Sequence, residues 1–153
     1  MKARNLILKT VGPNGESYGG FVWPLEVEAL VRAEQWDPSR ICGGGLHGLL
    51  HGSGDGELLD WRSNAKWLVV EGLESIIRVG EKVKCKSAIV RHVGDRKSAT
   101  DFIREHTAAS CIVGVTLTGG YGATLTGGYG ATLTGGNYAT LTGGHGATLT
   151  GGD

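Results

Sequence analysis

The sequence predicts an α+β domain, mostly an antiparallel sheet with one helix at its C-terminal end, followed by a short β-solenoid of octapeptide repeats. Three observations predict it. A strict eight-residue repeat fills residues 116–153, short apolar runs separated by turn residues come before it, and one amphipathic segment lies over 95–106. We therefore expect a globular domain over 1–107 and a solenoid over 108–153, in which 108–115 is an irregular capping turn.

The segments that precede the repeat are typical of a β-rich domain. Apolar or alternating runs predict strands at Leu6–Val11, at 67–70 and, as one long strand, over 82–92. Gly12 to Gly15 predicts a turn, and Pro24 places the extended segment 20–24 at a sheet edge. Residues 27–32 fit either a strand or a helix.

The segment from Asp95 to His106 predicts the helix. Ser98 and Asp101 have capping-box spacing, and Ala99, Phe102 and Ile103 form an apolar stripe. The long loop from Cys42 to Gly56 is rich in glycine and is predicted to carry no regular structure.

The repeat has the pattern Thr-Leu-Thr-Gly-Gly-x-x-Ala and begins at Thr116. Alanine and leucine alternate with the two threonines, so the apolar side chains share one face and the threonines the other. We expect the Gly-Gly pairs to supply positive φ angles and a small cross-section at each corner. This strict alternation favours an ordered stack over disorder, the alternative that a glycine-rich, uncharged segment leaves open.

Two octads close one flattened coil, so residue i is expected to stack on residue i+16. Successive rungs would lie ~4.7–4.9 Å apart, and the two threonines of one strand ~6.6 Å apart. One face would carry the columns Thr116, Thr132, Thr148 and Thr118, Thr134, Thr150, and the other Thr124, Thr140 and Thr126, Thr142. At the corners Tyr121 would stack over Asn137 and Tyr129 over His145, while Cys111, Ile112 and Val113 of the capping turn pack against the domain.

The octads, which read GYGATLTGG across their joints, resemble the central repeats of bacterial ice nucleation proteins. This resemblance covers residues 116–153, about two and a half coils. It implies stacked Thr-x-Thr strands that template ice, and a tyrosine ladder for pairing. Ice nucleators carry dozens of coils because nucleation needs a large template, so this chain would match them only by assembling many copies.

A second resemblance covers the whole chain. The segments GGFVWP (19–24), WDPSRICGGGLHGLLHGSGDG (36–56), WLVVE (67–71) and KVKCKSAIVRHVGDRKSATDFI (82–103), followed by the octads, resemble a family of small actinobacterial and phage proteins. That family shares the GLHG-containing N-terminal domain and ends in Gly-Thr repeats. The resemblance implies the architecture and no activity.

Two kinds of chemistry fit the loop from Cys42 to Gly56. A zinc site would use Cys42, His47 and His51, with Cys85 or His92 as a fourth ligand, although the Cys-x4-His-x3-His order is not a standard zinc spacing. The alternative is a loop whose histidines cap backbone groups or line a groove. A nucleophile would pair Cys42 or Ser53 with His47 or His51 and an acid such as Asp55.

Other charged and aromatic residues favour plainer interpretations. Lys82, Lys84 and Lys86 share one face of the predicted long strand and would attract a phosphate, but their alternation with apolar residues favours a solvated sheet face. The four tryptophans are expected to anchor the core and loops rather than stack bases, because no basic stripe interleaves them.

The charge balance and the cysteines bear on partners and compartment. The chain has 15 basic and 15 acidic residues, and Asp153 is the only charged residue of the octads, so 15 − 1 = 14 acidic residues precede them. This balance argues against binding to nucleic acid or an anionic membrane. Three cysteines without tight spacing, and no apolar run long enough to span a membrane, favour a cytoplasmic location.

These patterns favour a non-enzymatic structural protein whose Thr-Leu-Thr solenoid mediates self-association through its faces or its open end. The partner is then the protein itself, and no cofactor is expected. Two alternatives remain: an ice-binding threonine array, and a ligand-binding, zinc-binding or enzymatic module around Cys42 to Gly56.

Overall fold

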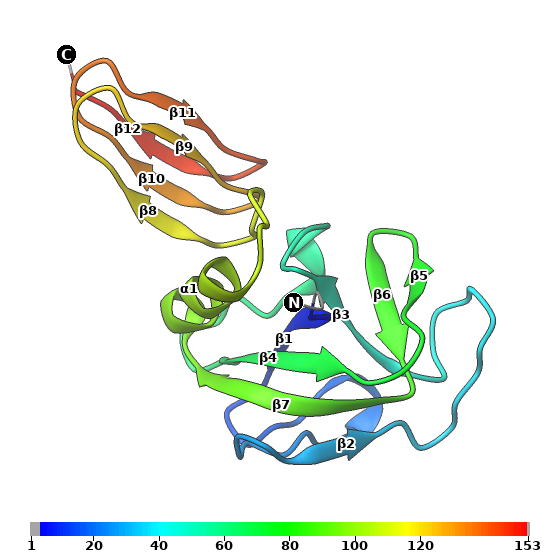
Figure 1. Cartoon of the computed structure of the whole chain (residues 1–153). Helices are drawn as coiled ribbons and strands as arrows, with labels where there is room; N and C mark the ends of the chain where they lie inside the picture. Colours follow the sequence, from blue (N-terminus) through cyan, green and yellow to red (C-terminus); the bar gives the residue numbers. More distant parts are fainter. Residues whose placement is uncertain (1–3, 153) are drawn as a thin grey trace.

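The computed structural model describes residues 4–152, and its first part is a seven-stranded sheet (Figure 1). Every neighbouring pair in the order β2-β7-β4-β1-β3-β6-β5 is antiparallel. The strands are β1 (Leu6–Val11), β2 (Leu30–Arg32), β3 (Leu46–Leu50), β4 (Lys66–Gly72), β5 (Ile77–Val79), β6 (Lys82–Cys85) and β7 (Ser87–Gly94). Short 3₁₀ turns occupy Tyr18–Gly20 and Gly56–Leu58.

The two central strands β4 and β1 are buried on both faces, which explains their continuous apolar sequences. Leu6 and Leu8 of β1 pack into one core cluster, whereas Ile7 between them packs into the other. Trp67 and Val69 of β4 alternate with Leu68 and Val70 in the same way. The sheet therefore has apolar layers above and below it.

Two predictions about the sheet were wrong. The expected single strand over 82–92 is two strands, β6 and β7, separated at Lys86, and they pair with different neighbours. The segment expected to be a loop contains β3, which lies between β1 and β6. Gly48 permits this position because a Cβ atom there would lie 2.7 Å from the carbonyl oxygen of Leu8.

Helix α1 (Arg96–His106) covers one face of the sheet beside β4 (Figure 1). Ala99 and Ile103 are fully buried, and Phe102 is half-buried. The capping box is formed by Asp95 and Ser98, not by Ser98 and Asp101, because the helix begins after Asp95, whose carboxylate accepts the Ser98 N–H at 2.8 Å. In the described part of the chain no helix has the length and apolar character needed to cross a membrane.

The octads form two small parallel sheets that lie beyond α1 (Figure 1). Their strands are β8 (Thr116–Thr118), β9 (Thr124–Thr126), β10 (Thr132–Thr134), β11 (Thr140–Thr142) and β12 (Thr148–Thr150). The sheet orders are β12-β10-β8 and β11-β9, so successive octads alternate between the sheets. Thr132 pairs with Thr116 and Thr148, and Thr140 with Thr124, which confirms the expected sixteen-residue register.

The corners use their glycines differently from the prediction. Positive φ angles occur not at the Gly-Gly pairs but at the seventh octad position, in Gly122, Gly130 and Gly146, and in Tyr138 of the third octad. Close stacking instead requires the second glycine of the pair at several corners, although a Cβ atom at Gly120 would meet nothing within 4 Å. A Cβ atom at Gly136 would lie 2.8 Å from the backbone carbon of Gly120, one sixteen-residue step earlier.

The octads and the sheet share one apolar core. Ile112, Val113 and Val115 are buried together with Ala131 and Leu133 in the cluster that contains Leu6, Leu8, Val69 and Ile103. Cys111 was expected to pack here as well but is exposed. Among the octad leucines burial is greatest at Leu133, which is 0% exposed, and decreases toward the far end, where Leu149 is 48% exposed.

Candidate functional site

The threonines of the octads form ordered columns on two surfaces. Six line the β8-β10-β12 sheet, which we call the six-threonine face, and four line the β9-β11 sheet, the four-threonine face. All ten are exposed or half-buried. Within residues 4–152 none of their hydroxyl groups forms a hydrogen bond with another protein group.

An aromatic column runs along one corner of the octads. The ring of Tyr129 lies 5.7 Å from that of Trp61 and 5.6 Å from that of His145. At the other corner Gly122 donates to the carbonyl of Asn137 at 2.8 Å, while the ring of Tyr121 contacts Tyr138 at 5.2 Å. The third octad has its tyrosine one position later, and this shift moves the ring contact from position 137 to position 138.

Trp61 connects the aromatic column to the globular part. Its Nε1 donates to the carbonyl of Gly56 at 2.8 Å, and its ring lies 5.3 Å from that of Trp67. Arg96 lies over the same ring at 5.8 Å. The octad backbone is also fixed here, since Gly114 donates to the carbonyl of Tyr129 at 2.8 Å. The first rung of the octads is therefore seated on the domain.

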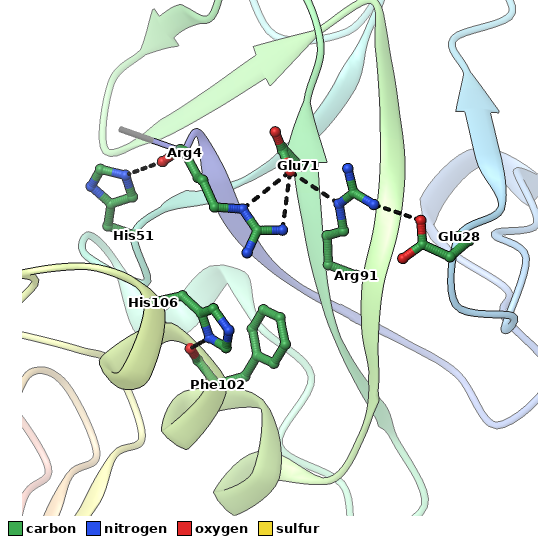
Figure 2. A network of polar contacts seen from close by, with 7 residues as sticks. All are labelled: Arg4, Glu28, His51, Glu71, Arg91, Phe102 and His106. Atoms are coloured by element: carbon green, nitrogen blue, oxygen red, sulfur yellow. Dashed lines mark hydrogen bonds and ion pairs between the residues drawn. The ribbon is translucent and has the colours of Figure 1, made fainter. Parts of the chain in front are cut away.

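The proposed zinc ligands do not converge in the structure. Cys42 and His47 lie near each other, but His51 turns to the carbonyl of Arg4, 3.0 Å from its Nε2 (Figure 2). His92 on β7 contacts the Ser98 hydroxyl at 2.9 Å instead. Over residues 4–152 no group of three or more metal-binding side chains is present, and Cys85 is buried separately, where burial and Glu74 raise the pKa of its thiol to about 11.

The residues of the nucleophile hypothesis do not converge either. The Ser53 hydroxyl donates to the carbonyl of Cys111 at 3.3 Å, and the Asp55 carboxylate accepts the Glu57 N–H at 2.9 Å. Cys42 lies 3.2 Å from the Nζ of Lys82. Cys42, Ser53 and Asp55 thus have separate partners, and the structure forms no triad from them.

A polar network beside His51 links β4 and β7 to the segments that precede β1 and β2 (Figure 2). Glu71 on β4 accepts hydrogen bonds from Arg4 at 3.2 Å and from Arg91 on β7 at 3.0 Å. Arg91 also pairs with Glu28 at 2.6 Å. Burial raises the pKa of Glu71, but the bonds from Arg91 and Arg4 outweigh it and lower the pKa below its usual value. The network is structural, because each charge already has a partner.

Beside Cys42 and His47 lies a cavity of about 660 Å³. Lys84 is 0% exposed next to it, so the expectation of a solvated sheet face was wrong for Lys84, whereas Lys86 of the same expected face is exposed. The Lys84 Nζ donates to the carbonyls of Ile41 and Gly43, each at 3.0 Å, and lies 5.6 Å over the ring of Trp36. Trp23 and Trp67 are buried core residues.

Comparisons with known proteins give relatives of one kind. No family model and no solved structure matches the chain. The chain is 37% identical over 106 residues to the ice nucleation protein InaU of Pantoea ananas and to an ice nucleation protein of Pseudomonas syringae, and 34% identical over 101 residues to that of Xanthomonas campestris pv. translucens. These matches cover 67%, 67% and 64% of this chain but only 10%, 9% and 6% of the relatives.

The chain thus spans about a tenth of the length of the curated relatives that it matches. The octads over 116–153 supply 153 − 115 = 38 residues, so a match over 67% of the chain extends into the residues before Thr116. The resemblance to small actinobacterial and phage proteins stays a prediction. The homologues of this chain are ice nucleation proteins, and they support the ice-nucleation-like character of its repeats.

Proposed function

We propose that the octads form a short β-solenoid whose threonine faces bind ice. The observation that carries this proposal is the set of ten outward threonines, held in register at sixteen-residue steps with hydroxyls that have no protein partner within residues 4–152. The names of the homologous proteins support it.

The physical argument rests on flatness and spacing. Parallel pairing holds the rungs ~4.7–4.9 Å apart, and the β-branched threonines have few side-chain rotamers, so each face is a stiff grid of methyl and hydroxyl groups. A rigid grid loses little conformational entropy when it contacts a crystal surface. No charged side chain projects from residues 116–152 to hold a competing hydration shell.

The extent of the grid sets the kind of activity. The six-threonine face has three rungs and the four-threonine face has two. A patch of this size can adsorb to an ice crystal that already exists, whereas nucleation requires a much larger template. We therefore expect a single chain to slow ice growth, and nucleation only where many chains assemble.

The test is ice-recrystallisation inhibition by the full chain and by a Thr118→Lys, Thr134→Lys variant. Both threonines are exposed on the six-threonine face, so the lysines should abolish ice binding without disturbing the buried leucines. Thr124→Lys with Thr142→Lys tests the other face, and Ser63→Lys on the domain is the matched control. A wild-type protein without effect on ice growth contradicts the proposal.

The open end of the octads favours a second candidate, self-association. β12 pairs only with β10, and β11 only with β9, so within the described residues the last strand of each sheet has a free edge. Leu149 is exposed beside that edge. Free edges of parallel strands bind further strands, and a second copy of the chain offers matching ones. Asp153, expected to act as a weak brake at this end, lies outside the described residues.

Light scattering of the full chain and of a Leu149→Lys, Thr150→Lys variant tests this candidate. If the open end joins copies, two lysines at the last rung should convert an oligomer into a monomer, whereas Ser63→Lys should not. A wild-type monomer at high concentration contradicts it.

For the compartment we propose the cytoplasm, since Cys42 and Cys111 are exposed free thiols that suit a reducing environment.

A further inference from the structure

The cavity beside β1, β3 and β6 is lined by positive charge that has no acidic partner in contact. Lys9 and Lys82 line it, and Lys84 lies buried beside it. Over residues 4–152 no carboxylate oxygen lies within 4.0 Å of any of the three amines. Glu34 is the one carboxylate among the described lining residues, and Asp37 acts on Lys84 only from a longer distance.

The electrostatic effect of this cluster is visible in its neighbours. Burial, and then the charge of Lys82, lower the pKa of Lys9 to about 8. Burial, and then Lys82, Lys9 and Lys84, lower the pKa of His47 to about 4, so His47 is neutral at neutral pH. Burial and the neighbouring lysines thus both disfavour the charged form of Lys9 and of His47.

The rest of the lining is apolar and aromatic. Lys9 lies 5.5 Å over the ring of Trp23, and Phe21 meets Trp23 edge-on with ring centroids 5.8 Å apart. Leu46 and Leu58 also contribute to the wall. A volume of about 660 Å³ falls within the range of small-molecule sites, which combine an apolar wall with a few placed polar groups.

Segment 41–45, which forms the rim of the cavity, is held in place by hydrogen bonds from Lys84 and Asp37. Lys84 binds the carbonyls of Ile41 and Gly43, and Asp37 donates its N–H to the carbonyl of Gly44 at 2.8 Å. A side chain at Gly45 would lie 3.0 Å from the ring of Trp36 and 3.1 Å from the stem of Lys84. The glycine-rich segment 41–45 is therefore shaped by Lys84, whereas Lys82 donates only to the Cys42 thiol at 3.2 Å and Lys9 lies over the Trp23 ring, so neither of these two amines has a carboxylate partner within 4.0 Å among residues 4–152.

We propose that this cavity binds a small organic anion, with a phosphate or carboxylate head at Lys82 and Lys9 and a flat apolar body against Phe21 and Trp23. An anion there supplies the negative charge that the lysines lack and forms charge-assisted hydrogen bonds with their amines. The aromatic wall gives the body its contact area. This site is independent of the threonine faces and of ice binding.

The experiment is a titration of the full chain with phenyl phosphate, followed by amide NMR shifts. Inorganic phosphate tests the head alone, phenol the body alone, and benzoate distinguishes a carboxylate from a phosphate head. Lys82→Gln should weaken phenyl phosphate binding about tenfold or more, because one charge-assisted bond is lost. Lys86→Gln, an exposed lysine after the same strand, is the matched control and should change the affinity less than about twofold.

Phe21→Ala separates the two parts of the site. It should weaken phenyl phosphate and leave inorganic phosphate unchanged. Equal weakening by Lys82→Gln and Lys86→Gln would show non-specific attraction and overturn the site, as would the absence of phenyl phosphate binding at millimolar concentration. If inorganic phosphate bound as tightly as phenyl phosphate, the proposed contact between the apolar part of the ligand and the aromatic wall would be contradicted. Lys82→Gln should leave ice-recrystallisation inhibition unchanged, so this proposal can fail while the ice proposal stands.

Discussion

The antiparallel sheet and the octads are both β-structures, but they obtain their register in different ways. In the sheet, each central strand has its own apolar sequence, and alternate residues fill two different core clusters. In the octads every strand is Thr-Leu-Thr, and register follows from identical residues stacking at sixteen-residue steps. The first arrangement specifies one fold, whereas the second specifies only a spacing.

The two regions also differ in how their stability is distributed. The sheet has apolar cover on both faces, so its core residues are buried almost uniformly. The octads have one thin interior whose burial decreases from Leu133 to Leu149. We infer that the octads depend on the domain for a rigid first rung, and that they open from their far end.

The largest expected effect tests this gradient. Leu133→Ala removes a fully buried side chain and should lower the free energy of unfolding by about 2–4 kcal/mol. Leu149→Ala makes the same chemical change at the exposed end and should cost less than about 0.5 kcal/mol. Chemical denaturation measures both, and equal costs would show that the octads are uniformly stable.

The next effect concerns the junction. Trp61→Ala removes the ring between Trp67 and Tyr129 and should cost about 2 kcal/mol, less than a fully buried tryptophan because the residue is 36% exposed. Hydrogen exchange should speed up most in residues 116–152. Exchange that rises equally in the sheet would contradict a specific role at the first rung.

Alanine substitutions at two uncrowded glycines of the first octad measure the effect of a positive φ angle alone. At both Gly122 and Gly120 an added Cβ meets no atom within 4 Å, but only Gly122 has a positive φ, of 69°. Gly122→Ala should cost about 1 kcal/mol, whereas Gly120→Ala should be neutral or slightly stabilising. Thermal unfolding compares them. If the two substitutions cost similar free energies of unfolding, the positive φ angle would not be the reason for glycine at the seventh octad position.

The smallest effect concerns the positive charge that the domain buries at Lys9. Lys9→Met should stabilise the protein at pH 7 by up to about 1 kcal/mol, because burial disfavours the ammonium group. The pKa of Lys9 is about 8 in the folded protein and 10.5 in its ordinary, unfolded state, so between these pH values the unfolded state binds more protons. Wild-type stability should therefore rise from pH 8 to 10.5, and the advantage of Lys9→Met should shrink over that range.

How far the sequence predicts the structure also differs between the two regions. The eight-residue period predicted that identical residues stack, and the expectation that two octads close one coil set the step at sixteen residues, as the strand pairing confirms. β1, β4 and the helix followed from apolar patterns. In contrast β3 was missed, because Gly45, Gly48 and Gly52 in and around it indicate a turn, and only its neighbours β1 and β6 make it a strand.

The candidate site was predicted in part for a similar reason. The segment with Cys42 and His47 was singled out, but Lys9, Trp23 and Phe21 come from elsewhere in the chain and had no local signal. Lys84 was expected in solvent because it alternates with apolar residues. Its buried position depends on the carbonyls of Ile41 and Gly43, which are more than 40 residues away.

Because successive octads alternate between two sheets, an odd and an even number of inserted octads would change the threonine faces differently. One octad inserted after Thr118 would move each later strand to the opposite sheet and give the two faces six threonines each, while the stacking contacts of every rung would keep the same chemistry. Two inserted octads would restore the faces and add one rung to each. The gene can therefore lengthen this surface in steps of eight codons without altering the domain on which the first rung rests.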